Sequence, residues 1–251
     1  MKARFILSPI VLLVALSILF SSCTEMANKL ASVALNHNFE YEHEDTVKWG
    51  RIVEEDLNLP AFSAIDAEGL VSVVFTQHDS ISRVRVRANQ KCLDEYKFEV
   101  RKDELKVKMK KADTKIDKTT PGIILYVTAP ALTGVELSGG GIVTLLRRID
   151  IPGTLNIELN GACKLFADSL SVGELELEAN GASKCDFAHI IAKENIEIEI
   201  NGAGDVDANV FCQELRIQMN GAGKGTFSGE CKKLICEENG ASKVDFSKLK
   251  R

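Results

Sequence analysis

The sequence lacks the features that mark several large classes of protein. Its formal net charge is −5, so it has no excess of Lys and Arg with which to neutralise the phosphates of a nucleic acid. None of its seven cysteines forms a C-x-x-C pair, which argues against a zinc site or a thioredoxin-like redox motif. No useful length of helical periodicity appears between residues 60 and 251. The chain is therefore expected to be all-β and to have no nucleic-acid partner.

Residues 1–23 have the pattern of an export signal, with a basic start, an apolar run over residues 5–20 and two serines before Cys23. A transmembrane helix is the alternative, but Pro9 divides the apolar run and no basic cluster follows it. The string Leu-Phe-Ser-Ser-Cys at residues 19–23 resembles a bacterial lipobox. This resemblance implies a lipoprotein signal peptide over 1–23, lipidation of Cys23 and attachment to a membrane through acyl chains.

Two regions of different pattern follow the signal. Residues 24–58 are polar and of mixed charge, and they are predicted to form a tether. Between residues 59 and 135, apolar and polar residues alternate, as in Val84 to Arg87 and Leu105 to Val107. This alternation predicts half-buried strands, separated by turn-like stretches such as Gln77 to Ser80.

A repeat of about 20 residues occupies the region from 136 to 251. Asn-Gly-Ala recurs in steps of 20, 21, 19 and 19 residues, starting at Asn160, Asn180, Asn201, Asn220 and Asn239. Ser138-Gly139-Gly140-Gly141 looks like an earlier, degenerate copy. Asn-Gly between strands is ordinarily a hairpin signal, but the constant period and flanking pattern favour stacked coils. One repeat at ~3.3 Å per residue suits one coil of a parallel β-helix, with coils about 4.8 Å apart.

Alignment of the repeats on the asparagine separates inward from outward rows. Apolar residues stand five and three positions before each Asn, and they are predicted to face the interior together with the Ala two positions after it. Glutamate dominates the row two positions before the Asn, which is predicted to face outward. The asparagines themselves are predicted to form a structural corner ladder, because Asn and Gly tolerate sharp turns and stacked amides can hydrogen-bond along the axis.

The outward glutamates form a candidate cation-binding or partner-binding face, made of Glu158, Glu176, Glu178, Glu197, Glu199 and Glu237. In register, these like charges would stand about 5 Å apart and would destabilise one another. A bound Ca²⁺ ion, a cationic partner or a run of lysines from a second subunit would offset this repulsion. The alternative is a solvated face that binds nothing. No other cofactor is predicted.

Several of these elements together resemble the head GIN domain family, described as auto-transporter adhesins. They are the lipobox, the strand-like strings starting at Phe62, Val71 and Glu104, and the Asn-Gly-Ala-Gly repeats. The resemblance covers roughly Phe62 to Phe246. It departs from the family at Gln77-His78-Asp79, where a glycine turn is more usual. It implies a right-handed parallel β-helix in an envelope protein, and it supplies no binding residues to carry over.

These observations predict a lipid-anchored cell-envelope protein, placed at the outer membrane on its periplasmic or surface side. It would act as an adhesin-like binding or structural module without enzymatic activity. Its ligand could be a glycan or a protein, and the chain could also form homo-oligomers. The alternative is a polysaccharide lyase or hydrolase using Asp186 and Asp207 near Lys184. No long insertion builds the walls of a sugar cleft, however. Cys212 and Cys231 share an offset in adjacent repeats, and free thiols are favoured there over a strained disulfide.

Overall fold

The computed structural model of the chain describes residues 48–110 and 120–251. These residues form a ten-stranded sheet and include one short helix, α3 at Gln90–Leu93. The expected all-β class is therefore confirmed. The expected signal peptide with Cys23, and residues 24–47 of the expected tether, lie outside the described residues. Within the described parts of the chain, no helix is long and apolar enough to cross a membrane.

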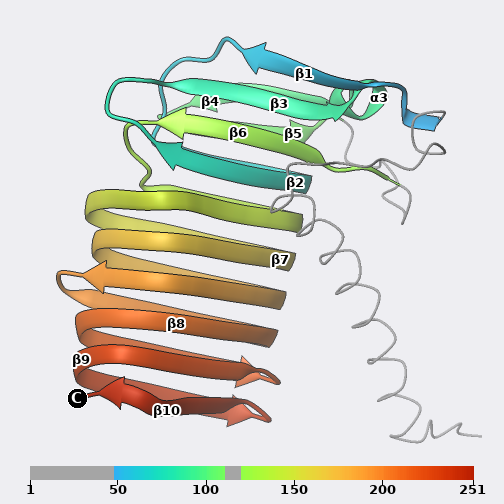
Figure 1. Cartoon of the computed structure of the whole chain (residues 1–251). Helices are drawn as coiled ribbons and strands as arrows, with labels where there is room; N and C mark the ends of the chain where they lie inside the picture. Colours follow the sequence, from blue (N-terminus) through green and yellow to red (C-terminus); the bar gives the residue numbers. More distant parts are fainter. Residues whose placement is uncertain (1–47, 111–119) are drawn as a thin grey trace, which may run out of the picture.

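Six strands form the N-terminal part, which lies above the rest of the molecule in Figure 1. They are β1 (Ile52–Leu57), β2 (Ala64–Gln77), β3 (Arg83–Asn89), β4 (Tyr96–Arg101), β5 (Glu104–Met109) and β6 (Ile123–Ala129). The sheet order is β1-β3-β6-β2, and the hairpin of β4 and β5 pairs with the first half of β2. The strands β1, β3 and β6 pair antiparallel, whereas β6 and β5 pair parallel with β2.

Strand β1 lies inside the segment 24–58 that the sequence pattern assigned to a tether. It forms the edge of the sheet and is held to β3 by ion pairs as well as by the ladder of backbone hydrogen bonds. Arg83 Nε and Arg85 Nε lie 2.9 and 3.1 Å from Asp56 Oδ1. Hydrogen bonds from these two guanidinium groups lower the pKa of Asp56 to about 2. The acidic run Glu54-Glu55-Asp56 therefore belongs to a charged edge strand, which has no strict period-two pattern.

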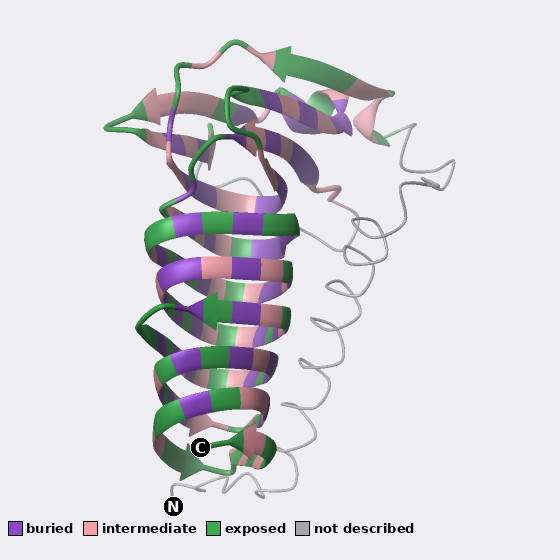
Figure 2. Cartoon of the chain, turned by 60° about the vertical axis from the view of Figure 1, so that its left-hand side comes forward, coloured by how far each residue is buried: buried purple, intermediate pink, exposed green. Residues whose placement is uncertain are grey.

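The remaining strands wind in successive coils, so that each circuit lies under the one before it (Figures 1 and 2). They are β7 (Gly134–Ala192), β8 (Asn195–Gly221), β9 (Lys224–Gly240) and β10 (Lys243–Lys250). Pairing is parallel and equivalent residues meet: Asn180 pairs with Asn201, and Gly181 with Gly202. Strand β2 also belongs to this stack, because Gly69 pairs with Gly139. The region expected to hold only N-terminal strands thus supplies the first level of the stack.

Alternation along each coil places the aliphatic rows inside, as the bands of buried and exposed residues in Figure 2 illustrate. The rows five and three positions before each Asn are buried as far as Leu215 and Ile217. In the last level, Leu234 and Cys236 are only half-buried.

The predicted inward position of the Ala row is wrong. The members of this row are half-buried or exposed: Ala162, Ala182, Ala203, Ala222 and Ala241. The inward place after the corner goes to the residue that follows the Ala, as the buried Cys163, Ser183 and Gly204 show. The Ala before it therefore lies on the outer side.

All six described cysteines are free thiols. Cys212 and Cys231 pair in register on adjacent levels, as expected, and they are not bonded to each other. Burial, with a smaller effect of Cys231, raises the pKa of the Cys212 thiol to about 12. The thiolate is thus suppressed, and this pair is a structural part of the interior rather than a reactive site.

Candidate functional site

The corner of each coil is built on a column of glycines that begins one level above the recognisable repeats. Gly69 and Gly139 head the column, and all its members have positive φ, from 88° to 138°: Gly69, Gly139, Gly161, Gly181, Gly202, Gly221 and Gly240. A Cβ atom on Gly181 would lie 2.6 Å from the carbonyl oxygen of Gly161 on the level above. Any side chain would therefore separate the levels, so this position requires glycine for two independent reasons.

The asparagines before these glycines are joined by side-chain hydrogen bonds along the stack. Asn180 Nδ2 donates to Asn160 Oδ1 at 3.0 Å, and Asn201 Nδ2 donates to Asn180 Oδ1 at 3.0 Å. Asn220 and Asn239 continue the series, with donor–acceptor distances of 2.9 Å. From Asn180 to Asn239, each amide thus gives one of its two N–H groups to the level above it.

The second N–H of the upper amides goes to the glutamate two residues earlier in the same coil. Asn160, Asn180 and Asn201 donate to Glu158, Glu178 and Glu199 at 2.7, 2.8 and 2.9 Å, respectively. These three carboxylates lie in the candidate acidic face, and the structure gives them a role in supporting the asparagine ladder. The sequence pattern did not reveal this role, since it requires knowing which way each amide points.

The acidic row extends above the residues that the sequence analysis selected. Glu136 and Ser138 take the places of Glu158 and Asn160, and Ser138 Oγ lies 3.5 Å from Glu136 Oε1. Asp66 pairs in register with Glu136 and accepts ion pairs from Lys106 at 2.9 Å and Lys108 at 3.3 Å. The signal in the sequence was the spacing itself, because an acid stands three residues before the corner glycine at these levels too.

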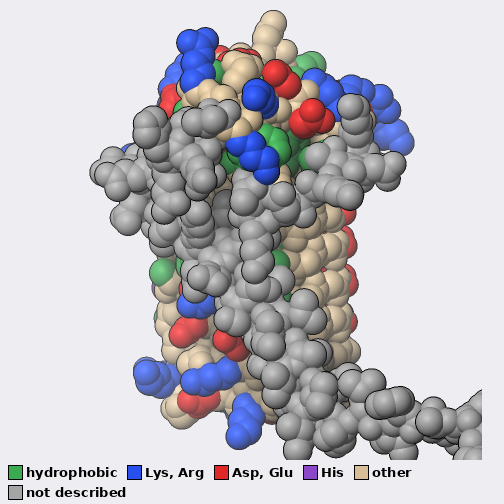
Figure 3. All heavy atoms as spheres, turned by 90° about the vertical axis from the view of Figure 1, so that its right-hand side faces the viewer, with side chains coloured by type: hydrophobic (Ala, Val, Ile, Leu, Met, Phe, Trp, Pro, Cys, Tyr) green, Lys and Arg blue, Asp and Glu red, His purple; other side chains and the backbone are tan. Residues whose placement is uncertain are grey.

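Two of the remaining predicted residues form a second, more exposed row, and the third, Glu237, belongs to the first row, in register with Gln218. Glu176 and Glu197 are exposed and pair in register, and Arg216 follows them one level below, with its Nε 3.9 Å from Glu197 Oε1. Glu237 is exposed on the last full level. Figure 3 shows acidic side chains recurring down one edge of the stack. Among the residues that the structure describes, no three His, Cys, Asp or Glu side chains are grouped closely enough to hold a metal ion.

Glu136 is the member of the acidic row whose pKa is raised. Burial is the main cause that raises its pKa, and the charges of Asp66, Glu158 and Glu104 add to it. When the pKa of a carboxyl group is higher in the folded state, the protein becomes less stable as the pH rises past the pKa of that group in the unfolded chain. We therefore expect Glu136→Gln to raise the melting temperature at pH 7 and to leave it unchanged at pH 3, as measured by scanning calorimetry. An equal gain at both pH values would contradict the electrostatic explanation.

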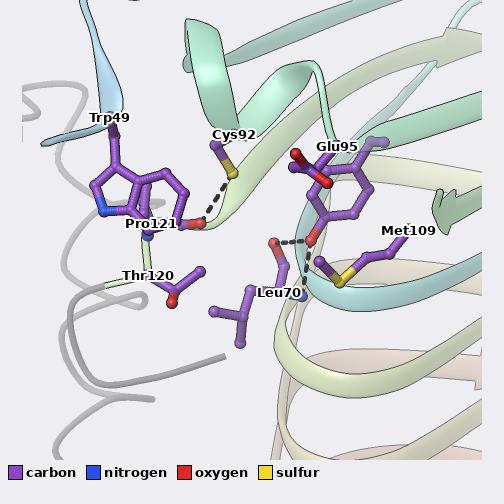
Figure 4. Close-up of a pocket in the computed structure, with 8 residues that line it drawn as sticks. Trp49, Leu70, Cys92, Glu95, Met109, Thr120 and Pro121 are labelled. Atoms are coloured by element: carbon purple, nitrogen blue, oxygen red, sulfur yellow. Dashed lines mark hydrogen bonds between the residues drawn. The ribbon is translucent and has the colours of Figure 1, made fainter. Parts of the chain in front are cut away.

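A small pocket lies where the N-terminal strands cover the first level of the stack (Figure 4). Its lining is mainly apolar and consists of Trp49, Leu70, Cys92, Glu95, Tyr96, Met109, Thr120 and Pro121. The Tyr96 hydroxyl accepts a hydrogen bond from Leu70 N at 3.1 Å, and a Cβ on Gly69 would lie 2.8 Å from this hydroxyl. Tyr96 thus closes the top of the glycine column, and we interpret the pocket as part of this cap.

One level of the stack carries an exposed apolar group that the sequence analysis missed. Ile191 and Phe211 pair in register and are 46% and 38% exposed, and the ring of His189 lies 5.2 Å from that of Phe211. The register shifts between Phe187 and Ile190, and the strands break between Ala192 and Asn195 at this level. Exposed apolar side chains and a bulge at one place are typical of a contact surface.

Comparison with known proteins places this geometry in a family. Residues 61–188 and 176–251 match the family described as "Putative auto-transporter adhesin, head GIN domain". No curated protein matches the chain significantly.

Several solved structures are similar in fold. A structure described as a "putative adhesin" from Bacteroides fragilis has a TM-score of 0.55 and 16% identity, over 80% of this chain and 97% of that one. Two further putative adhesins come from Parabacteroides merdae and Parabacteroides distasonis, with TM-scores of 0.50 and 0.51 and identities of 16% and 15%. Each covers 80% of this chain, and the chain covers 97% and 96% of their lengths.

Proposed function

The chain belongs to the head GIN domain family, and from this premise we propose that it is an exported, lipid-anchored module of the cell envelope that binds a partner. Residues 1–23 would serve as the signal peptide, and acyl chains on Cys23 would hold the mature protein at the outer membrane. The family description as an adhesin supports a binding role over a catalytic one.

The coil stack would be a right-handed parallel β-helix that presents flat, rigid faces. Parallel pairing with equivalent residues in register, as between Leu175 and Ile196, supports this description. Rigid backbone columns hold outward side chains at a constant spacing of about 4.8 Å. Such a surface suits an extended partner that contacts several levels at once.

The exposed acidic row is the observation that carries the proposal. Glu176 and Glu197 stand in register on the same face as Glu178 and Glu199, so four carboxylates lie on two adjacent levels. The asparagine amides engage Glu178 and Glu199, whereas Glu176 and Glu197 are exposed. Arg216 Nε lies 3.9 Å from Glu197 Oε1, so a cationic ligand would compete with Arg216 there. A surface of one charge sign attracts a partner of the opposite sign, so we propose a cationic protein or peptide as the ligand.

A carbohydrate-active enzyme is less well supported. Asp186 and Asp207 do pair in register, but Lys184 Nζ lies 3.3 Å from Asp186 Oδ2, so the base and the acid of this group are paired with each other. Between Gly134 and Lys250 the strands are interrupted only by two-residue breaks, which offer little material for the walls of a substrate cleft.

The binding role can be tested with a fluorescent oligolysine peptide and fluorescence anisotropy. We expect the double variant Glu176→Gln/Glu197→Gln to bind this probe about fivefold more weakly than the unchanged protein, since two exposed charge pairs contribute ~0.5 kcal/mol each. Binding should also weaken as the salt concentration rises. The asparagine ladder is untouched by these substitutions and the repulsion between Glu176 and Glu197 is removed, so the melting temperature should not fall.

The matched control is Asp186→Asn/Asp207→Asn, which removes the same charge from another face. An equal loss in this variant would assign binding to net charge alone and would contradict a specific acidic face. No binding of oligolysine by the unchanged protein, together with a melting temperature raised by millimolar Ca²⁺, would assign the face to a metal ion instead. Weaker binding of a glycan by Phe211→Ala would move the site to the exposed apolar group.

A further inference from the structure

The first levels of the stack carry apolar side chains on their outer surface. Positions three and five after the corner glycine alternate outward, and lower levels hold charged residues there, such as Lys184 and Asp186. In the upper levels Val74, Ile142 and Phe166 take three of these positions, and they alternate with the polar Ser72, Thr144 and Lys164. We call this surface the outer apolar patch; it consists of Leu70, Val74, Ile124, Tyr126, Ile142 and Phe166.

The patch is continuous across several levels. Strand β6 brings Tyr126 into register with Val74 of β2, and Ile124 into register with Ser72. On the other side of β2, Val74 pairs with Thr144 of β7, so Ile142 lies two residues along the same outer surface. None of the six patch residues belongs to the core cluster inside the coils.

Leu70 is shielded by described residues, because it lines the pocket with Trp49, Tyr96 and Met109. The rest of the patch is shielded although no described strand lies across it. Ile142, Ile124, Leu70 and Val74 are 0%, 2%, 5% and 7% exposed. Within residues 48–110 and 120–251, the substantial contacts between elements join neighbours in the sheet or join α3 to β3. An outward apolar surface of this extent on a soluble protein marks a contact site.

The chain enters the described body beside this patch. Trp49 lines the same pocket as Leu70 (Figure 4), so residue 48 follows directly from a segment that ends at the patch border. That preceding segment contains Met26, Leu30 and Val33, a spacing typical of one face of an amphipathic helix. The residues between Leu35 and Lys48 can span roughly 40 Å when extended, which exceeds the roughly 15 Å height of the patch.

The other stretch outside the described residues fits the patch less well. Residues 111–119 read Lys-Ala-Asp-Thr-Lys-Ile-Asp-Lys-Thr, with one large apolar side chain among charged and polar ones. This segment therefore offers fewer large apolar side chains to the patch than residues 24–47 do.

We propose that residues 24–47 dock on the outer apolar patch through Met26, Leu30 and Val33. The mature protein would then carry its anchor close against the side of its upper coils, rather than at the end of a free tether. Docking would fix which side of the stack faces the membrane and would leave the acidic face turned in a constant direction.

Carbene footprinting with mass spectrometry tests this proposal on the chain from residue 23 carrying Cys23→Ser, which removes the predicted acylation site. We expect Leu30→Glu/Val33→Glu to increase labelling of the peptides that contain Tyr126, Ile142 and Phe166 at least threefold. The matched control Ser32→Glu places a charge in the same segment and should leave this labelling unchanged. Circular dichroism and labelling around Asp186 should stay constant in both variants, because neither touches the folded core.

Three results would overturn the proposal. The first is a patch that is already fully labelled in the unchanged chain. The second is protection that survives Leu30→Glu/Val33→Glu but disappears on dilution, which would assign the patch to a second copy of the chain. The third is protection that appears only when phospholipid vesicles are added, which would assign it to the membrane surface.

Discussion

Replacement of Gly202 by alanine is expected to destabilise the protein by about 4 kcal/mol, one of the largest effects of any single substitution in the stack. Gly202 has a φ of 122°, an angle that residues other than glycine rarely adopt. Its added Cβ would lie 2.5 Å from the carbonyl oxygen of Gly181 and 3.2 Å from its carbonyl carbon. The neighbour is backbone held in the sheet, so it cannot move aside without breaking hydrogen bonds between levels. Such a loss is a large fraction of the ordinary stability of a domain.

The matched control for this prediction is Gly153→Ala. A Cβ on Gly153 would meet no atom within 4 Å, and its φ is not positive. We expect this variant to stay within about 0.5 kcal/mol of the unchanged protein. Urea unfolding followed by circular dichroism measures both variants. If the two substitutions lower the free energy of unfolding equally, the close approach of the levels at the glycine column does not contribute to stability.

The repeats made the coil stack predictable because each level recreates one physical environment. Leu175, Ile196 and Leu215 share an offset from the asparagine, and they share a buried place. The first level was not recognised as a repeat, because Glu68 stands before Gly69 where an asparagine stands in the repeats. Strand β1 escaped as well, because its charged residues serve an edge strand rather than alternating with apolar ones.

The acidic face could be predicted as a row but not as a set of interactions. Like charges at Glu178 and Glu199 suggested that an external cation is needed, since the sequence shows the carboxylates and their spacing alone. In the structure, Asn180 and Asn201 donate to these carboxylates, so part of the compensation is internal. The direction of a side-chain amide depends on the level above it, which no pattern within one repeat contains. The outer apolar patch was missed for a similar reason, because its members come from three strands.

Asn201→Asp is expected to destabilise the protein by about 3 kcal/mol at pH 7, because it reverses the donor pattern in the middle of the ladder. Asn201 Nδ2 donates to Asn180 Oδ1 at 3.0 Å and to Glu199 Oε1 at 2.9 Å. An aspartate would turn a carboxylate oxygen toward both acceptors and would add a charge beside Glu199. Its other oxygen could still accept from Asn220, so the loss falls on the upper half of the ladder.

The effect of Asn201→Asp should depend on pH in a defined direction. Acceptors and a neighbouring carboxylate disfavour ionisation, so the folded-state pKa of the introduced carboxyl is expected to rise above its unfolded value. The folded state then binds a proton more readily than the unfolded state, and the destabilisation should shrink as the pH falls below the raised pKa. Protonation also restores one donor, which can again reach Asn180 or Glu199.

Asn156→Asp and Asn201→Ala separate the two causes in urea unfolding at pH 7 and pH 4. Asn156 is exposed on the same face, at the position that Glu176 and Glu197 take in the next levels, so Asn156→Asp adds the same charge without touching the ladder and should change stability by less than about 0.5 kcal/mol. Asn201→Ala removes the donors without adding charge, so its cost should be similar at both pH values. An Asn201→Asp variant no less stable than Asn156→Asp would mean that the hydrogen bonds between the stacked amides do not contribute to stability. A loss confined to Asn201→Asp and Asn201→Ala would make the ladder a source of the stability that keeps the acidic row rigid.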